Sequence, residues 1–281
     1  WLKFTLSLHA RAPQLPIMVL EVTWVHPVLL QIPGVPIPLY SFGTFLSLAL
    51  LACYVAVEYE IERLQLKIDA GYVMIGCIIC GVAGAKLHYL ASYSGDALDG
   101  AGFNFQGGAV CGTAYMIGYL RFCKERLMLT LDALAPILAL GLGLGKIACF
   151  VSGDGCYGPP SDLPWAMSFP NGGVPTKVPV HPTPLYETIG GLLIFAVLWR
   201  LRVKHCNGRG SQVASMLIGL GLERFLAEFV RTHEDFFLGL TQYQCISATM
   251  MVAGVLWHLA LHFLAKTKKE SDKGVGVCNV C

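Results

Sequence analysis

Long apolar stretches separated by short polar segments dominate the pattern along this chain. A helix that crosses the hydrocarbon core of a bilayer needs about 20 mostly apolar residues. Windows that fit this requirement occur seven times, and the third is short and rich in glycine. The seven predicted membrane-spanning helices are residues 39–57, 71–91, 107–120, 131–151, 184–201, 213–230 and 244–264.

The basic residues between these helices fall mostly on one side. Thirteen lysines and arginines lie after the first, third and fifth helices or in the C-terminal tail, whereas Lys3, Arg11 and Lys177 lie on the other side. The positive-inside rule therefore places the N-terminus outside and the C-terminus in the cytoplasm. We predict an all-α integral membrane protein with seven transmembrane helices.

The chain divides into three parts. Residues 1–38 are predicted to form an interfacial segment, because their apolar patch is too short to span and no signal-peptide cleavage site follows. Residues 39–265 are the seven-helix domain and residues 266–281 a polar cytoplasmic tail. The outward connection, residues 152–183, is rich in Gly and Pro and contains Trp165 and Phe169, which predicts a loop that covers a substrate at the membrane surface.

Composition supports this picture and excludes several functions. Hydrophobic residues make up 55% of the 281 residues and charged residues 14%, which is typical of a membrane protein. A net charge of +2, without basic runs interleaved with aromatics, predicts no nucleic-acid partner. The pairs Cys77/Cys80 and Cys278/Cys281 lack the further ligands that a metal site needs. No metal and no cofactor are predicted.

Four basic residues fall within or beside the predicted helices: Lys86, Lys146, Arg224 and Arg231. Charges in hydrocarbon are costly unless they are paired or hydrated, so they are functional candidates by default. Arg224, Glu228 and Arg231 are spaced by four and three residues, which places them on one helical face. That face must lie against protein or a hydrated cavity.

Glu228 has two interpretations. In the first, it neutralises its neighbours and holds helices together, since intramembrane pairing often serves structure. In the second, it orients an arginine for a ligand. One carboxylate cannot neutralise both Arg224 and Arg231, and surplus guanidinium groups suit an anionic ligand, most naturally a lipid phosphate held by bidentate hydrogen bonds.

Two further polar elements lie at the predicted outer face. The fourth helix ends in a glycine-rich stretch that contains Lys146 and Asp154, and such glycines allow close approach of either a ligand or another helix. The sequence HPTPLYE, residues 181–187, begins the fifth helix. Thr183 and Pro184 are typical of a helix start, so His181 is either a structural anchor or a site residue.

The order of these elements resembles the phosphatidylglycerol:prolipoprotein diacylglyceryl transferases of bacteria, from about residue 28 to residue 264. HPTPLYE looks like the family's HPxxLYE element, and the glycine-rich stretch that ends in residues 154–158 looks like its signature sequence. RFLAEFVR, residues 224–231, is similar to the family's RFxxEFxR helix. Asp132, Pro136 and residues 241–244 also fall at matching places.

The resemblance implies transfer of the diacylglyceryl group from phosphatidylglycerol to the lipobox cysteine thiol of a preprolipoprotein in the bacterial plasma (inner) membrane, among membrane lipids. It implies that Arg224 stabilises the phosphate, Glu228 orients Arg224, Asp154 and His181 shape the polar cavity, and Lys146 adds a second cation. The other residues implied to bind substrate are Gln106, Gly107, Gly108, Gly158, Tyr186, Glu187, Arg231 and Asp132.

The chain departs from the family's pattern at several positions. Gln106 stands where the family has the histidine often named as the base, and an amide cannot take a proton. His181, His88 or water are the alternatives for that proton. The other departures are Lys146 for arginine, Cys149 for asparagine, Phe42 for tyrosine and Asp154 for glutamate. They keep open a second function, a lipid-binding accessory subunit with impaired activity. A solute transporter is disfavoured because no inverted repeat is found.

Overall fold

The computed structural model describes residues 5–8, 18–31, 34, 38–92, 102–205, 208–231, 235–237 and 239–276. Seven helices lie within these residues, so the predicted number of helices is confirmed there. They are α1 (Ser41–Leu64), α2 (Ala70–Ser92), α3 (Phe105–Phe122), α4 (Leu127–Ser152), α5 (Thr183–His205), α6 (Ser211–Glu228) and α7 (Gln242–Gly276).

Five of the described helices are long and apolar enough to cross a membrane: α1, α2, α4, α5 and α7. Helices α3 and α6 have 18 residues each and are not among the five. The apolar window of α7 is only 6% buried inside the protein, and large apolar side chains such as Ile79 and Leu193 are also exposed. Exposed apolar surface on this scale suits contact with lipid.

Helices α1 and α7 continue beyond their predicted ends. Helix α1 ends at Leu64, seven residues after the predicted boundary, and α7 reaches Gly276 in the segment predicted to be a polar tail. Hydropathy marks where side chains leave lipid, whereas a helix ends where its backbone hydrogen bonds end. After the last helical residue of α1, the C-cap residue Gln65 adopts a left-handed conformation with φ of 51°.

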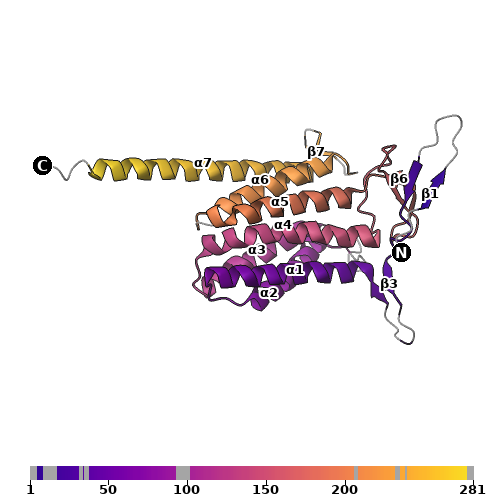
Figure 1. Cartoon of the computed structure of the whole chain (residues 1–281), viewed down its shortest axis with the longest axis horizontal. Coiled ribbons are helices and arrows are strands. Elements are labelled where there is room, and N and C mark those ends of the chain that lie inside the picture. Colours follow the sequence, from indigo (N-terminus) through magenta and orange to yellow (C-terminus); the bar gives the residue numbers. More distant parts are fainter. Residues whose placement is uncertain are drawn as a thin grey trace.

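A four-stranded sheet covers one end of the bundle (Figure 1). Its order is β1 (Thr5–Leu8), β2 (Met18–Glu21), β5 (Met167–Phe169) and β6 (Thr176–Val180), with β2 parallel to β5. The N-terminal segment and the connection between α4 and α5 therefore form one structure. We call this end of the bundle the sheet end. The prediction of an all-α protein missed these strands, because each has five residues or fewer and lacks a long alternating pattern.

The other strands form two hairpins near helix starts. They are β3 (Val28–Leu30) with β4 (Leu39–Tyr40), and β7 (Asp235–Phe237) with β8 (Leu240–Thr241).

A small apolar core lies beneath the sheet. Phe169 is fully buried, and its ring stacks on that of Tyr157 with centroids 4.3 Å apart. Phe169 was predicted in a loop at the membrane surface, and within that loop its side chain is buried in the protein and anchors the sheet to the bundle. Trp165 is half exposed, as expected for an interfacial residue, and its indole donates a hydrogen bond to the Tyr186 hydroxyl at 2.8 Å.

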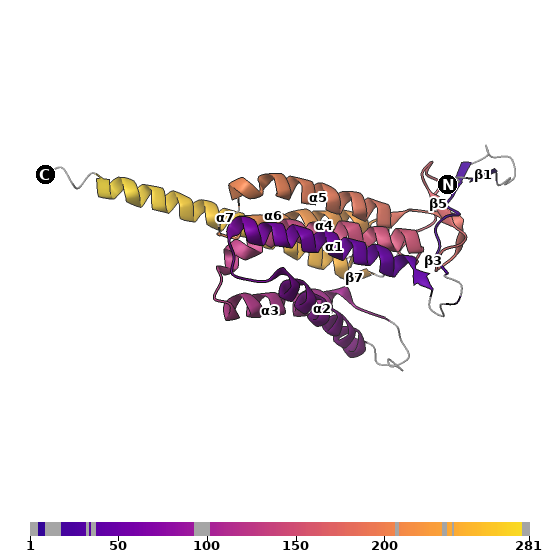
Figure 2. The same cartoon turned by 60° about the horizontal axis from the view of Figure 1, so that its bottom comes forward.

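Helix α4 is central and packs against α1, α5 and α6, whereas α2 and α3 pack mainly on each other (Figure 2). Close approach of α2 and α3 depends on glycine, since a Cβ on Gly107 would lie 2.3 Å from the Gly84 carbonyl oxygen. A Cβ on Gly108 would likewise lie 3.0 Å from the Gly81 carbonyl oxygen. These two glycines therefore serve helix packing.

A buried ion cluster fixes the end of the bundle opposite the sheet. Glu60 of α1 is fully buried and binds Arg63 at 2.5 Å and Arg202 of α5 at 2.8 Å. The Arg202 guanidinium also stacks on the Trp199 ring, 3.7 Å from its centroid. Arg63 and Arg202 had been predicted in connections, but they lie in helices and join α1 to α5.

Candidate functional site

Glu187 is the centre of an ion cluster near the sheet end. It lies in the second turn of α5, and its carboxylate is nearly fully buried. Arg224 Nη1 of α6 lies 2.7 Å from Oε1 and Arg231 Nη1 lies 2.9 Å from the same oxygen, while Lys146 Nζ of α4 pairs with Oε2. Three cations from two neighbouring helices and the turn after α6 thus converge on one carboxylate.

Arg224 bridges two acidic residues. Its Nη2 lies 2.9 Å from Glu228 Oε2, one helical turn further along α6, so Arg224 and Glu228 share one helical face as predicted. Arg231 was predicted on that face too, but α6 ends at Glu228 and Arg231 lies in the turn that follows. Glu228 Oε1 accepts a hydrogen bond from the Thr241 hydroxyl at 2.9 Å. The Arg224 guanidinium also lies 4.8 Å from the centroid of the Tyr243 ring. These contacts fix the guanidinium between α5, α6 and the start of α7.

The cations are more exposed than the two carboxylates that they bind, and Glu223 of α6, which is partly buried, also lies near them. The side chains of Lys146, Arg224 and Arg231 are 28%, 25% and 14% exposed, whereas those of Glu187 and Glu228 are 4% and 0% exposed. The carboxylates therefore lie behind the cations and hold them in place. We call the exposed ends of Lys146, Arg224 and Arg231 the cationic face.

Local capping positions the helices that build the cluster. Thr241 and Gln244 form a reciprocal capping box at the start of α7, with the Thr241 amide donating to Gln244 Oε1 and the Gln244 amide donating to Thr241 Oγ1. At the start of α5, the Thr183 hydroxyl donates a short hydrogen bond to the Cys156 carbonyl. Helix α5 begins at Thr183, as the TP sequence predicts.

The HPTPLYE element places a polar network beside the cluster. His181 Nδ1 lies 3.4 Å from the Tyr186 hydroxyl, which also accepts the Trp165 indole hydrogen bond. Gly158 allows this loop to approach α6, since a Cβ there would lie 2.2 Å from the Val230 carbonyl oxygen. His181, Tyr186 and Gly158 are therefore adjacent to one another and to the end of α6.

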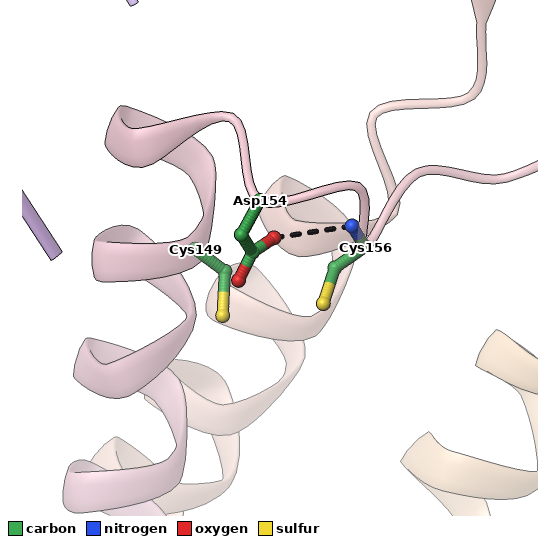
Figure 3. A group of neighbouring side chains, drawn as sticks. All are labelled: Cys149, Asp154 and Cys156. Carbon is green, nitrogen blue, oxygen red and sulfur yellow. Dashed lines mark hydrogen bonds between the residues drawn. The ribbon is translucent and has the colours of Figure 1, made fainter. Parts of the chain in front are cut away.

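The loop after α4 carries further titratable groups. The Asp154 carboxylate accepts a hydrogen bond from the Cys156 amide at 3.1 Å, and the Cys149 thiol lies beside both (Figure 3). Burial, and then the nearby Asp154 carboxylate, raise the pKa of the Tyr157 phenol well above its ordinary value. Tyr157 therefore stays neutral at physiological pH and serves packing under the sheet.

Two groups of predicted site residues lie elsewhere. Asp132 accepts hydrogen bonds from the backbone amides of Gly210, Gln212 and Val213 at 2.9–3.2 Å and so caps the N-terminus of α6. It precedes Lys146 by 14 residues of one helix, which corresponds to about 21 Å. The geometry gives Asp132 a structural role and offers no support for substrate binding.

Gln106, Gly107 and Gly108 begin α3, and among the described contacts none joins them to the ion cluster. The Gln106 backbone amide donates a hydrogen bond to Asn104 Oδ1 at 3.0 Å. His88 of α2 packs against Gly107, and its Nδ1 is buried with no hydrogen-bond partner among the described residues. His88 thus lies beside the position where a histidine was expected from the resemblance.

Sequence spacing did not indicate the central place of Glu187. It identified Glu228 as the partner of Arg224 because both lie on one helix, but it carried no information on which helices pack together. The available signal was topological: Lys146 and Arg224 lie near the C-terminal ends of α4 and α6, and Glu187 lies near the N-terminal end of the intervening antiparallel helix α5, so all three fall at one end of the bundle.

Comparison with known proteins agrees with the arrangement of these elements. The prolipoprotein diacylglyceryl transferase family matches residues 27–260. A phosphatidylglycerol–prolipoprotein diacylglyceryl transferase of Bordetella avium is 32% identical over 240 residues, which are 79% of this chain and 89% of the relative. The protein of the same name from Idiomarina loihiensis is 31% identical, with 89% of this chain and 96% of the relative covered.

The matched region contains all seven described helix starts and every residue of the ion cluster. With this coverage, and relatives above 30% identity over most of both chains, the chain belongs to the prolipoprotein diacylglyceryl transferase family.

Proposed function

We propose that this chain transfers the diacylglyceryl group of phosphatidylglycerol to the lipobox cysteine thiol of a preprolipoprotein, during lipoprotein maturation. Its relatives are named for this reaction, and it covers 89% of the Bordetella avium protein. The observation that carries the proposal is the cationic face, in which Lys146, Arg224 and Arg231 are partly exposed and their carboxylate partners are buried.

The chemistry needs positive charge where a phosphate leaves. The acceptor thiolate forms a bond to the glyceryl carbon, the bond from that carbon to the phosphate oxygen breaks, and glycerol phosphate departs as an anion. A planar guanidinium at Arg224 suits the phosphate oxygens, and Lys146 adds a point charge. Charges fixed before the reaction stabilise the transition state without reorganisation. Glu187 and Glu228 hold these cations in place through their ion pairs.

The remaining site residues support binding in this scheme. His181, Tyr186, Gly158 and Asp154 border the cationic face and are proposed to shape the polar cavity for the head group. Gln106 cannot accept the thiol proton, so His88, which packs against the neighbouring glycine, and His181 are the candidate acceptors. Replacing each histidine by glutamine and measuring the rate as a function of pH distinguishes the two.

The sheet end is proposed to lie outside the cytoplasm. In this arrangement all seven helices cross the inner membrane of a bacterium, residues 1–38 lie at the outer surface and residues 266–281 extend into the cytoplasm. Thirteen basic residues on the opposite side support this orientation. It brings the cationic face to the leaflet where secreted precursors arrive.

The test is transfer by the purified protein in nanodiscs of phosphatidylglycerol. A lipobox peptide should release glycerol phosphate and gain a diacylglyceryl group, whereas a peptide with serine in place of the cysteine should do neither. Absence of release, under conditions in which the Bordetella avium protein is active, contradicts the proposal.

A second candidate, a lipid-binding accessory subunit, is favoured by the single observation that Gln106 stands in place of an acid–base residue. Its signature is copurified, intact phosphatidylglycerol that is not consumed when the lipobox peptide is added.

A further inference from the structure

Three side chains able to ligate a metal meet at the end of α4 (Figure 3). They are Cys149 in the last turn of the helix and Asp154 and Cys156 in the loop that follows. Their ligand atoms lie within 4.8 Å of one another, and all three residues are half-buried. The two thiols have no part in the transfer proposed above, and the spacing of cysteines along the sequence had predicted no metal site.

The backbone holds these residues together without an ion. The amides of Gly153 and Asp154 donate to the Cys149 carbonyl at 3.0 and 3.4 Å, which turns the loop back over the helix end. Gly153 and Gly155 adopt φ values of 62° and 87°, which favour glycine and allow two tight bends in three residues. The site is therefore largely formed before a ligand arrives.

Two thiols and one carboxylate are a ligand set typical of Zn²⁺. Zinc binds sulfur at about 2.3 Å and carboxylate oxygen at about 2.0–2.2 Å in a tetrahedron, which places ligand atoms roughly 3.3–3.8 Å apart. The observed cluster reaches that geometry by shifts of about 1 Å. One Asp154 oxygen accepts the Cys156 amide hydrogen bond, as is usual for carboxylates that bind a metal, and the carboxylate also lies beside both thiols.

The site lies next to the cationic face. Lys146 precedes Cys149 by three residues on the same side of α4. Both Lys146 and Arg231 interact electrostatically with the Cys156 thiol. Two thiolates, a carboxylate and Zn²⁺ carry a net charge of −1, so a neighbouring lysine is favourable. Three protein ligands leave the fourth tetrahedral position open, as in catalytic zinc sites.

We propose that Cys149, Asp154 and Cys156 bind one Zn²⁺ ion, whose open position takes the thiolate of the acceptor cysteine. The second half of this proposal rests on the proposed function. A thiol that binds zinc loses its proton to water. Its sulfur then forms the bond to the glyceryl carbon as the carbon–oxygen bond breaks and the electron pair leaves with the phosphate. Zinc at this position activates the thiol even though residue 106 is glutamine.

The first experiment measures metal binding without turnover. The full-length protein is purified in detergent with a thiol reductant, stripped with a chelator and titrated with Co²⁺, whose thiolate charge-transfer absorption reports bound sulfur. We expect one Co²⁺ per chain, displaced by Zn²⁺. Binding should be lost in the Cys149→Ser/Cys156→Ser variant and kept in the matched control Cys245→Ser on α7. Absence of thiolate absorption in the wild type, or equal absorption in the double variant, overturns the zinc site.

If the double variant fails to fold, the thiolate absorption of the Co²⁺-loaded wild type alone decides whether the zinc site exists. A second outcome also overturns the site, namely a Cys149–Cys156 disulfide found by mass spectrometry in protein isolated without reductant, since an oxidising compartment favours such bonds.

The second experiment tests the acceptor thiolate. Adding a lipobox peptide to the Co²⁺ protein should increase the charge-transfer absorption by about half, from two thiolates to three, whereas the serine peptide should leave it unchanged. An unchanged spectrum with the cysteine peptide overturns this part. Full glycerol phosphate release by metal-free protein also overturns it while leaving the transferase function intact, whereas Co²⁺ binding without any release contradicts the function and leaves the site.

Discussion

Replacing Glu187 by glutamine should strongly destabilise the protein. The carboxylate faces Lys146, Arg224 and Arg231, with the two arginine contacts at 2.7 and 2.9 Å. One charge pair at 4 Å is worth about 4 kcal/mol at an effective dielectric constant near 20. Desolvation offsets much of this, and removal of one partner of a buried pair typically costs about 3–5 kcal/mol. We expect a loss of about 3–5 kcal/mol in the free energy of unfolding.

The assay is equilibrium unfolding in mixed micelles, followed by circular dichroism. The matched control is Glu62→Gln, because Glu62 is exposed on α1 and should change stability by no more than about 0.5 kcal/mol. Phosphatidylglycerol should recover part of the Glu187→Gln loss, since its phosphate faces the same cations, and phosphatidylcholine should recover less. A loss below about 1 kcal/mol, or equal recovery by both lipids, would refute the reasoning.

Three other changes separate ligand binding from folding. Arg224→Lys keeps the charge but loses the planar guanidinium whose two terminal nitrogens bind Glu187 and Glu228. The kcat/KM for glycerol phosphate release should therefore fall about tenfold to hundredfold, while the free energy of unfolding changes less than in Glu187→Gln. Asp132→Ala removes the cap of α6 and should lower the free energy of unfolding by about 2 kcal/mol, with the rate per folded molecule unchanged. Glu60→Gln should cost about 3 kcal/mol at the opposite end of the bundle without altering the KM for lipid.

The helical bundle was predictable because most of its helices carry their own signal. An apolar run of sufficient length predicts a helix in lipid regardless of its neighbours, and so the number of helices and most of their starts follow from the sequence. The sheet was not predictable in this way. Strands β2 and β5 are three or four residues long and about 150 residues apart in the chain, and their pairing depends on the tertiary structure.

The candidate site was predictable only in part. Spacing on one helix correctly joined Arg224 to Glu228. Lys146, which the intramembrane charge rule marked as a candidate, lies in the same cluster. The convergence on Glu187 arises from packing between α4, α5 and α6, which spacing does not encode. The cluster of Cys149, Asp154 and Cys156 was missed because its ligands are separated by a helix end and two glycine bends rather than by a recognisable metal-binding spacing.

The most direct test of the account is an experimental structure of the protein in nanodiscs of phosphatidylglycerol. The account predicts a lipid whose phosphate lies within hydrogen-bonding distance of Arg224 and Lys146, with Glu187 and Glu228 still buried behind them. A head group bound elsewhere, with Arg224 and Arg231 contacting only protein carboxylates and no lipid at the cationic face, would contradict it.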